Sequence, residues 1–238
     1  MDLESVWKRA RADLVMTTAT GDPDLFLWEH SVRVAQYAQR IVKLAVVSSL
    51  RPDEAAVLAA ALYHDAGWAA RWRERDIERI EVLLGPPSEA LCEEGAALLE
   101  QSLAGLLPPD SIARASVAVR TRQDRTADSV EAHVLAEAEN LQEFGVLSLW
   151  PTIRRGAVDG KGVQAVLDTW KRKKEYQFWT ARLNDSFRFE PIRELAKERL
   201  RKFERLMKEL EEQHLGLDLT MPDPSTRTDP TSRPTARP

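Results

Sequence analysis

The chain has 238 residues, of which 43% are hydrophobic and 30% are charged, and its formal net charge is −4. This composition is sufficient for a buried core and excludes an intrinsically disordered protein. The weakly acidic balance also argues against a general nucleic-acid-binding protein, because such proteins are usually basic. The sequence contains no stretch of about 18 apolar residues, so neither a membrane-spanning helix nor a membrane partner is expected.

Apolar periodicity predicts helices along most of the chain, with no strand and no internal repeat, so the expected fold class is all-α. In chain order, the predicted helices cover residues 3–17, 25–47, 52–65, 75–84, 89–106, 108–119, 129–145, 163–184 and 191–214. Residues 18–23, 120–125 and 150–162 are expected to be turns or connections, because they are polar or contain Gly and Pro.

One helical domain is expected over residues 1–215. Its core covers about residues 25–150, and two long amphipathic helices follow over about residues 163–214. The remaining segment, residues 216–238, is rich in Pro and Thr and has no apolar periodicity, so a disordered tail is predicted there.

The chain has a single cysteine, Cys92, so no disulfide can form within it, and this suits a reducing compartment. Cys92 lies in a predicted helix and is expected to be a small core residue. Residues 1–16 include acidic side chains and lack the continuous apolar stretch of a signal peptide. We therefore expect a cytoplasmic protein.

The central predicted helix carries the strongest chemical signal. Its sequence, AAVLAAALYHDAGW over residues 55–68, is almost entirely apolar until it ends in His64 and Asp65. An imidazole and a carboxylate at the end of a buried helix need a compensating partner. A divalent metal would provide one, and so would ordinary hydrogen bonds that cap the helix. Asp53 is expected to cap the start of this helix.

Two further segments bear on that choice. His30 falls on the apolar face of its predicted helix, and Glu139 lies in the later segment LAEAENL. In this order, His30, His64-Asp65 and Glu139 resemble the signature of the HD-domain metal-dependent phosphohydrolase superfamily, in which the last position is Asp. The resemblance extends from about Leu14 to about Glu212, and it implies an HD-like helical bundle.

The resemblance implies a metal site made of His30, His64, Asp65 and Glu139, with Asp65 also helping to activate the nucleophile. Two imidazoles suit Mn, Fe, Co, Ni or Zn better than Ca, and Mg is also a candidate. Many relatives have further histidines near residues 120–122, where this chain has none. We therefore expect one divalent ion rather than two.

Arginines are the candidates for binding a substrate phosphate, because a guanidinium recognises phosphate in a bidentate manner. Arg33 lies one helical turn from His30, and Arg120 and Arg122 follow a predicted helix. For all three, the alternative is ordinary surface charge. His133 and Glu137 have a spacing that could chelate a metal, but an ion pair on an exposed helix face is the favoured interpretation.

Two functions follow from these observations. The first is a metal-dependent phosphomonoesterase or phosphodiesterase acting on a small phosphorylated metabolite, with nucleotides among the candidates. The alternative is a catalytically impaired HD-like protein that binds a ligand or partner. The His residues and Asp65 favour the enzyme, whereas Glu139 in place of Asp, one methylene longer, favours the alternative.

Overall fold

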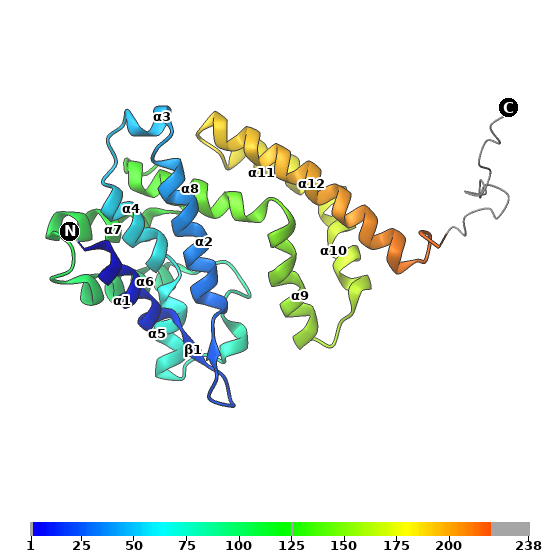
Figure 1. Cartoon of the computed structure of the whole chain (residues 1–238), viewed down its shortest axis with the longest axis horizontal. Coiled ribbons are helices and arrows are strands. Elements are labelled where there is room, and N and C mark those ends of the chain that lie inside the picture. The colour runs from blue at the N-terminus through cyan, green and yellow to red at the C-terminus, as the bar shows by residue number, and fades with distance from the viewer. Residues whose placement is uncertain (1, 125, 220–238) are drawn as a thin grey trace, which may run out of the picture.

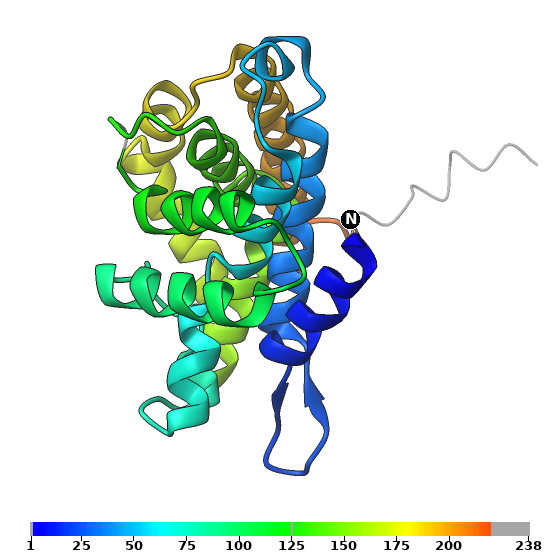
Figure 2. The same cartoon turned by 90° about the vertical axis from the view of Figure 1, so that its left-hand side faces the viewer.

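The computed structural model describes residues 2–124 and 126–219, and its fold is all-α, as predicted (Figures 1 and 2). The predicted tail lies mostly outside the described residues, since residues 220–238 are not among them. The helices are α1 Leu3–Leu14, α2 Phe26–Ile41, α3 Ala45–Ser48, α4 Glu54–Tyr63, α5 Ala66–Glu74, η1 Arg79–Glu81, α6 Glu89–Leu103, α7 Pro109–Thr121, α8 Val130–Glu143, η2 Val146–Ser148, α9 Leu149–Val158, α10 Val163–Glu175, α11 Phe178–Asp185 and α12 Glu190–His214.

Helix α4 lies at the centre of a globular part formed by α1–α8 (Figure 1). Every residue from Ala55 to Tyr63 is buried, because α1, α2, α6, α7 and α8 pack around it. The Asp53 side chain accepts hydrogen bonds from the backbone N–H groups of Ala55 and Ala56, which confirms the predicted cap. The helix therefore delivers its last residues into the interior of the bundle.

The N-terminal region differs from the prediction. Helix α1 ends at Leu14, and the chain then forms a two-stranded antiparallel hairpin of β1 Met16–Thr17 and β2 Pro23–Asp24. The hairpin projects from the globular part beside α1 and α2 (Figure 2). Gly21 has a φ of 89°, a conformation that glycine adopts readily and that reverses the chain. The expectation of no strand was therefore wrong here.

Several predicted boundaries were also wrong, and backbone geometry explains two of the differences. Arg75 has a left-handed φ of 64° and ends α5, so residues 75–84 contain only the short helix η1. Gln177, with a φ of 52°, divides the long helix predicted over 163–184 into α10 and α11. Residues 150–162, predicted as a connection, instead form most of α9, an amphipathic helix without a buried residue.

Helices α9–α12 form an arm that extends away from the globular part (Figure 1). An aromatic cluster holds the arm together and joins it to the end of α8. Trp179 makes edge-to-face contacts with Phe144, 5.4 Å away, and with Phe203, 6.0 Å away between ring centroids. Asn140 adds a hydrogen bond from its side chain to the Ser186 carbonyl at 2.8 Å. The arm is thus fixed to the face of α8 that leads to Glu139.

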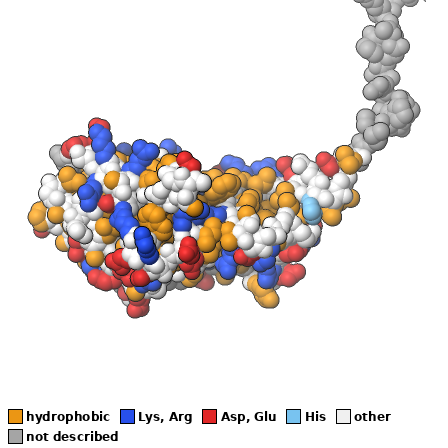
Figure 3. Space-filling model, turned by 90° about the horizontal axis from the view of Figure 1, so that it is seen from below, with side chains coloured by type: hydrophobic (Ala, Val, Ile, Leu, Met, Phe, Trp, Pro, Cys, Tyr) orange, Lys and Arg blue, Asp and Glu red, His pale blue; other side chains and the backbone are white. Residues whose placement is uncertain are grey.

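The surface seen from below carries charges of both signs, interspersed over the globular part, with hydrophobic side chains gathered near the arm (Figure 3). Cys92 is buried, as expected for a small core residue. Among residues 2–124 and 126–219, none of the helices combines the length and hydrophobicity needed to cross a bilayer.

Close packing of α5 on α6 fixes the position of the segment that follows Asp65. A Cβ atom added to Gly67 would lie 2.1 Å from the Leu91 carbonyl oxygen, so no side chain fits between the two helices.

We predict that Gly67→Ala lowers the free energy of unfolding by about 1–3 kcal/mol, despite the better helix propensity of Ala. Urea denaturation measures this. Gly85→Ala is the matched control, since a Cβ there meets nothing within 4 Å, and equal effects of both variants would contradict the packing argument.

The buried Glu137 carboxyl holds the start of α12 against α8. Its Oε1 atom accepts hydrogen bonds from the backbone N–H groups of Arg188 and Phe189, while its Oε2 atom is buried without a hydrogen-bond partner among the described residues. Burial raises the pKa of Glu137 from its ordinary value of 4.5 to about 7. The folded state therefore holds this proton more tightly than the unfolded state does.

This pKa shift predicts how stability depends on pH. Because the folded pKa is raised, the contribution of the Glu137 carboxyl is lost as pH rises from about 4.5 to about 7, at a cost of about 3 kcal/mol. Glu137→Gln keeps an oxygen acceptor but cannot ionise. The stability of this variant relative to the unmodified chain should increase by roughly that amount between pH 4.5 and pH 8, as measured by urea denaturation. Parallel pH profiles for the two proteins would show that Glu137 ionises normally.

Candidate metal centre

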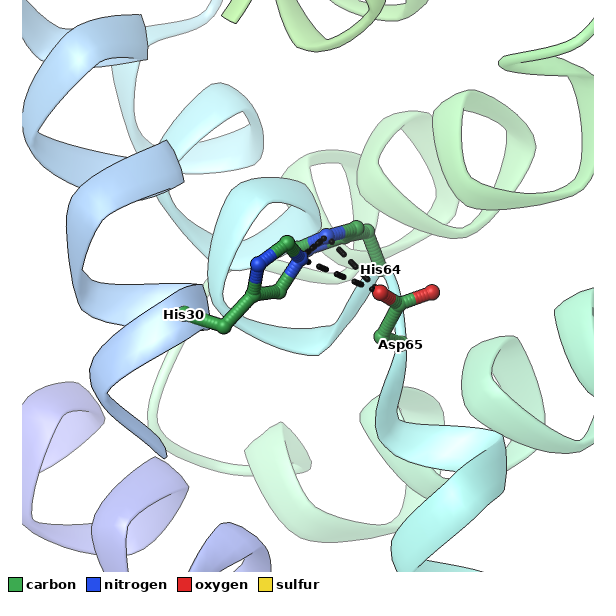
Figure 4. A group of neighbouring side chains, drawn as sticks. All are labelled: His30, His64 and Asp65. Atoms are coloured by element: carbon green, nitrogen blue, oxygen red, sulfur yellow. Dashed lines mark hydrogen bonds and ion pairs between the residues drawn. The ribbon is translucent and has the colours of Figure 1, made fainter. Parts of the chain in front are cut away.

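Three side chains from two helices meet at one point inside the globular part (Figure 4). His30 comes from the first turns of α2, and His64 and Asp65 follow the last residue of α4. The Nε2 atoms of His30 and His64 are 3.0 Å apart, and Asp65 Oδ2 lies 3.2 Å from the first and 3.3 Å from the second. We call this group the His-His-Asp cluster.

The separations within the cluster suit a single cation. Ligand atoms about 2.1 Å from one metal, at angles of about 90–110°, lie about 3.0–3.4 Å from one another. The three observed distances fall in this range. Two imidazole nitrogens and one carboxylate oxygen also form a donor set that transition metals bind well. The side chains present therefore fit a divalent metal.

The environment of His64 supports the same conclusion. Its ring is fully buried, and its Nδ1 atom lies 2.8 Å from the carbonyl oxygen of Ala61, to which an Nδ1–H group donates. This contact favours the tautomer in which the Nε2 lone pair faces His30 and Asp65. Metal-binding histidines usually donate their second ring N–H in this way.

The electrostatics show that the cluster attracts positive charge. Burial opposes the charged form of His64, but the Asp65 and Glu139 carboxylates outweigh this effect and raise the pKa of His64. Burial would raise the pKa of Asp65, yet the nearby His64 and Arg122 charges hold it well below its usual range. Burial lowers the pKa of His30. A divalent metal would satisfy this preference for positive charge.

Glu139 and Arg122 lie beside the cluster. Glu139 Oε1 is 3.8 Å from His64 Nε2 and 3.1 Å from Arg122 Nη1, so its nearer charged partner is the guanidinium. Arg122 Nη2 donates to Asp65 Oδ1 at 2.7 Å. The structure thus brings all four predicted ligand residues to one place, but Glu139 is not one of the three whose ligand atoms all lie within 4.8 Å of one another.

The position of Arg122 corrects the sequence interpretation. Residues 120–125 were predicted to be a polar loop, but α7 continues through Thr121, and the Arg122 side chain is only 1% exposed. The buried face of α7 includes Ser111, Ala115 and Ala118, and Arg122 continues this series at helical spacing. This spacing indicates that Arg122 lies on the buried face of the helix, whereas the polar composition of residues 120–125 suggested a loop.

The other two predicted phosphate-binding arginines are engaged elsewhere. Arg120 forms ion pairs with Glu93 at 2.6 Å and Glu100 at 2.9 Å, and it makes no described contact with the His-His-Asp cluster. Arg33 Nε donates to the side chain of Gln142 at 3.3 Å. The structure therefore brings only Arg122 of the three to the cluster.

The proposed pairing of His133 with Glu137 was wrong. The face was predicted to be exposed, but Glu137 is only 2% exposed and accepts hydrogen bonds from the start of α12. The His133 Nε2 atom instead lies 2.8 Å from the carbonyl oxygen of Ala127. Burial lowers the pKa of His133.

A cavity of about 830 Å³ runs along one face of α8 and reaches Arg122 and Glu139. Its far wall comes from α11 and the connection to α12, through residues that include Phe178 and Arg182. Cavities of this size accommodate small organic ligands. A second cavity, of about 500 Å³, lies between α9 and α10, and its lining contains none of the predicted site residues.

Comparisons with known proteins agree with this arrangement. The sequence matches the HD domain family over residues 27–143, a span that contains the His-His-Asp cluster, Arg122 and Glu139. No curated protein matched the sequence.

Among solved structures, Bacillus subtilis YpgQ is similar with a TM-score of 0.56 and 17% identity, over 91% of this chain and 98% of that chain. YpgQ in complex with ADP is similar with a TM-score of 0.51 and 19% identity, over 80% of this chain and 91% of that chain. At this identity the likeness concerns the fold, and it includes the arm as well as the globular part. The chain contains an HD domain, which spans residues 27–143 of its all-α fold.

Proposed function

We propose that this protein is a metal-dependent phosphohydrolase acting on a small phosphorylated molecule. The observation that carries the proposal is the His-His-Asp cluster, in which three ligand atoms lie at the mutual distances expected around one cation. The HD domain supports the hydrolase class. The cavity that reaches Arg122 and Glu139 offers a substrate a place next to the cluster.

In this proposal, His30, His64 and Asp65 hold one divalent ion, which is Mn, Fe, Co, Ni, Zn or Mg. When bound, such an ion lowers the pKa of a water molecule and screens the charge of a phosphate. The chain itself provides the alignment. The Ala61 carbonyl fixes the ring of His64 through Nδ1, and Arg122 fixes Asp65 through Oδ1. His64 Nε2 and Asp65 Oδ2 would then be the atoms that hold the ion.

Asp65 is also the proposed catalytic residue. Because its pKa lies well below the usual range, its carboxylate is ionised at neutral pH. Ionised, Asp65 Oδ2 can accept a hydrogen bond from a water molecule and orient it toward the substrate. A low pKa makes this group a weak base, so orientation and charge are its main contributions.

A nucleotide is the proposed substrate class. YpgQ, whose fold is similar, has been crystallised with ADP, and the cavity here contains features that suit such a ligand. Phe178 contributes an aromatic ring to the lining, and Asn140, Arg182 and Glu139 contribute polar groups. The phosphate end of the ligand would then point toward the His-His-Asp cluster.

The alternative function is a binding module without turnover, and one observation favours it. Arg122 already supplies a positive charge to Asp65 and Glu139, so a metal is not the only means of compensating these carboxylates. A protein of this kind would retain the cavity and bind its ligand without hydrolysing it.

A phosphatase screen separates the two functions. The purified chain is stripped of metal and assayed with nucleotides and sugar phosphates in the presence of Mn, Mg, Co or Ni. We expect hydrolysis of at least one nucleotide that depends on added metal, because a bound ion would lower the pKa of the attacking water, which no side chain of the cluster does. His64→Ala should reduce both Mn affinity and turnover by at least about 100-fold, since it removes a ligand.

His214→Ala is the control for that variant, because His214 lies at the exposed end of α12, where its Nε2 atom is 3.1 Å from Gln164 Oε1. It should behave like the unmodified chain. Ligand binding without turnover under every metal would support the alternative function. Absence of Mn binding by calorimetry would refute the metal-dependent proposal.

A further inference from the structure

The Arg122 side chain is buried against two carboxylates of the metal centre. Its guanidinium is 1% exposed and lies 2.7 Å from Asp65 Oδ1 and 3.1 Å from Glu139 Oε1. Burying a guanidinium is costly unless paired anions compensate it. A guanidinium stays protonated throughout the pH range in which proteins are folded, so Arg122 carries a permanent positive charge.

The two oxygen atoms of Asp65 serve different partners. Oδ2 faces the two histidines, while Oδ1 accepts the hydrogen bond from Arg122. A carboxylate that bridges two metal ions commonly gives one oxygen to each. Here the oxygen that would reach a second ion already has a cationic donor in contact with it. Glu139, the only other carboxylate beside the cluster among the described residues, faces the same guanidinium.

We propose that the Arg122 guanidinium is a built-in cation that fills the place of a second metal ion. This inference rests on the proposed metal-dependent function and specifies how its site is charged. The centre takes one divalent ion, held by His30, His64 and Asp65. Glu139 is a partner of Arg122 rather than a ligand of the ion.

The extra methylene of Glu139 agrees with this role. A Glu side chain is longer than Asp by about 1.5 Å, the length of a carbon–carbon bond, and its carboxylate lies closer to Arg122 than to His64. Arg122 and Glu139 are therefore positioning residues. The charges of Arg122 and Glu139 cancel, so the pair adds no net charge next to the ion. The hydrogen bond from Arg122 holds Asp65 in the orientation that presents Oδ2 to the histidines.

A double-mutant cycle on Mn²⁺ binding tests the proposal without requiring activity. Isothermal titration calorimetry gives the stoichiometry and dissociation constant for the unmodified chain, Arg122→Gln, Glu139→Gln and the double variant. Gln at position 122 removes the charge but also ends about 2 Å short of Asp65, so Arg122→Lys, which keeps the charge, is measured beside it to separate the two effects.

We expect one Mn²⁺ per unmodified chain. Arg122→Gln removes a repelling charge and should tighten Mn²⁺ binding about tenfold or more, whereas Glu139→Gln leaves that charge uncompensated and should weaken binding by a similar factor. The double variant, which removes a neutral pair, should bind within about threefold of the unmodified chain. Arg120→Gln is the matched control, because Arg120 pairs with Glu93 and Glu100 instead, and it should change nothing.

Two results would overturn the inference. The first is two Mn²⁺ ions per unmodified chain. The second is a double variant that binds as weakly as Glu139→Gln, as expected if Glu139 were a ligand of the ion.

If Arg122→Gln does not fold, Arg122→Lys and the double variant decide. Lys keeps the charge and should bind within about threefold of the unmodified chain, and a tenfold change would contradict the built-in cation. An unmodified chain that binds no Mn²⁺ refutes the proposed function itself, whereas normal binding with a failed cycle refutes only this inference.

Discussion

The structure depends on the burial of two ionisable side chains at the end of an apolar helix. Helix α4 is enclosed on all sides, so His64 and Asp65, which follow it, enter an environment where an unpaired charge is expensive. Each surrounding element supplies part of the compensation. Helix α2 contributes His30, α4 contributes the Ala61 carbonyl, and the end of α7 contributes Arg122. The bundle is thus arranged around a site with a strong preference for positive charge.

This arrangement links fold to chemistry. A buried, fully oriented pair of histidine nitrogens and one carboxylate oxygen loses little entropy when a metal binds, because the side chains are already held in place. The arm contributes a wall to the cavity in the same region. By packing on α8, it closes the far side of the cavity that reaches Glu139, with Glu137 and Asn140 fixing the connection before α12. The cavity is therefore shared between the globular part and the arm.

Much of the fold and part of the candidate metal centre could be predicted from local sequence patterns. The apolar run of α4, the Asp53 cap and the inward face of His30 all follow from helical periodicity, which acts over a few residues. The all-α class followed for the same reason. The family resemblance placed His30, His64, Asp65 and Glu139 together, and the structure brings them to one site.

The errors arose where long-range packing or single backbone angles decide. Arg122 was assigned to a loop because its neighbours are polar, although it is buried in an ion pair with Asp65, 57 positions earlier in the sequence. Arg75 and Gln177 adopt left-handed conformations that few non-glycine residues favour, so the ends of α5 and α10 gave no compositional signal. Helix α9 was missed because glycines obscured an amphipathic pattern that buries no residue.

The most direct test of the account is a crystal structure of the full chain soaked with Mn²⁺, measured with anomalous diffraction. We expect one anomalous peak per chain, in contact with His30, His64 and Asp65, with Arg122 still bonded to Asp65 and Glu139 outside the coordination sphere. A chain without a peak at this cluster, or with its only peak elsewhere, would contradict the central claim that the buried His-His-Asp cluster is a metal centre.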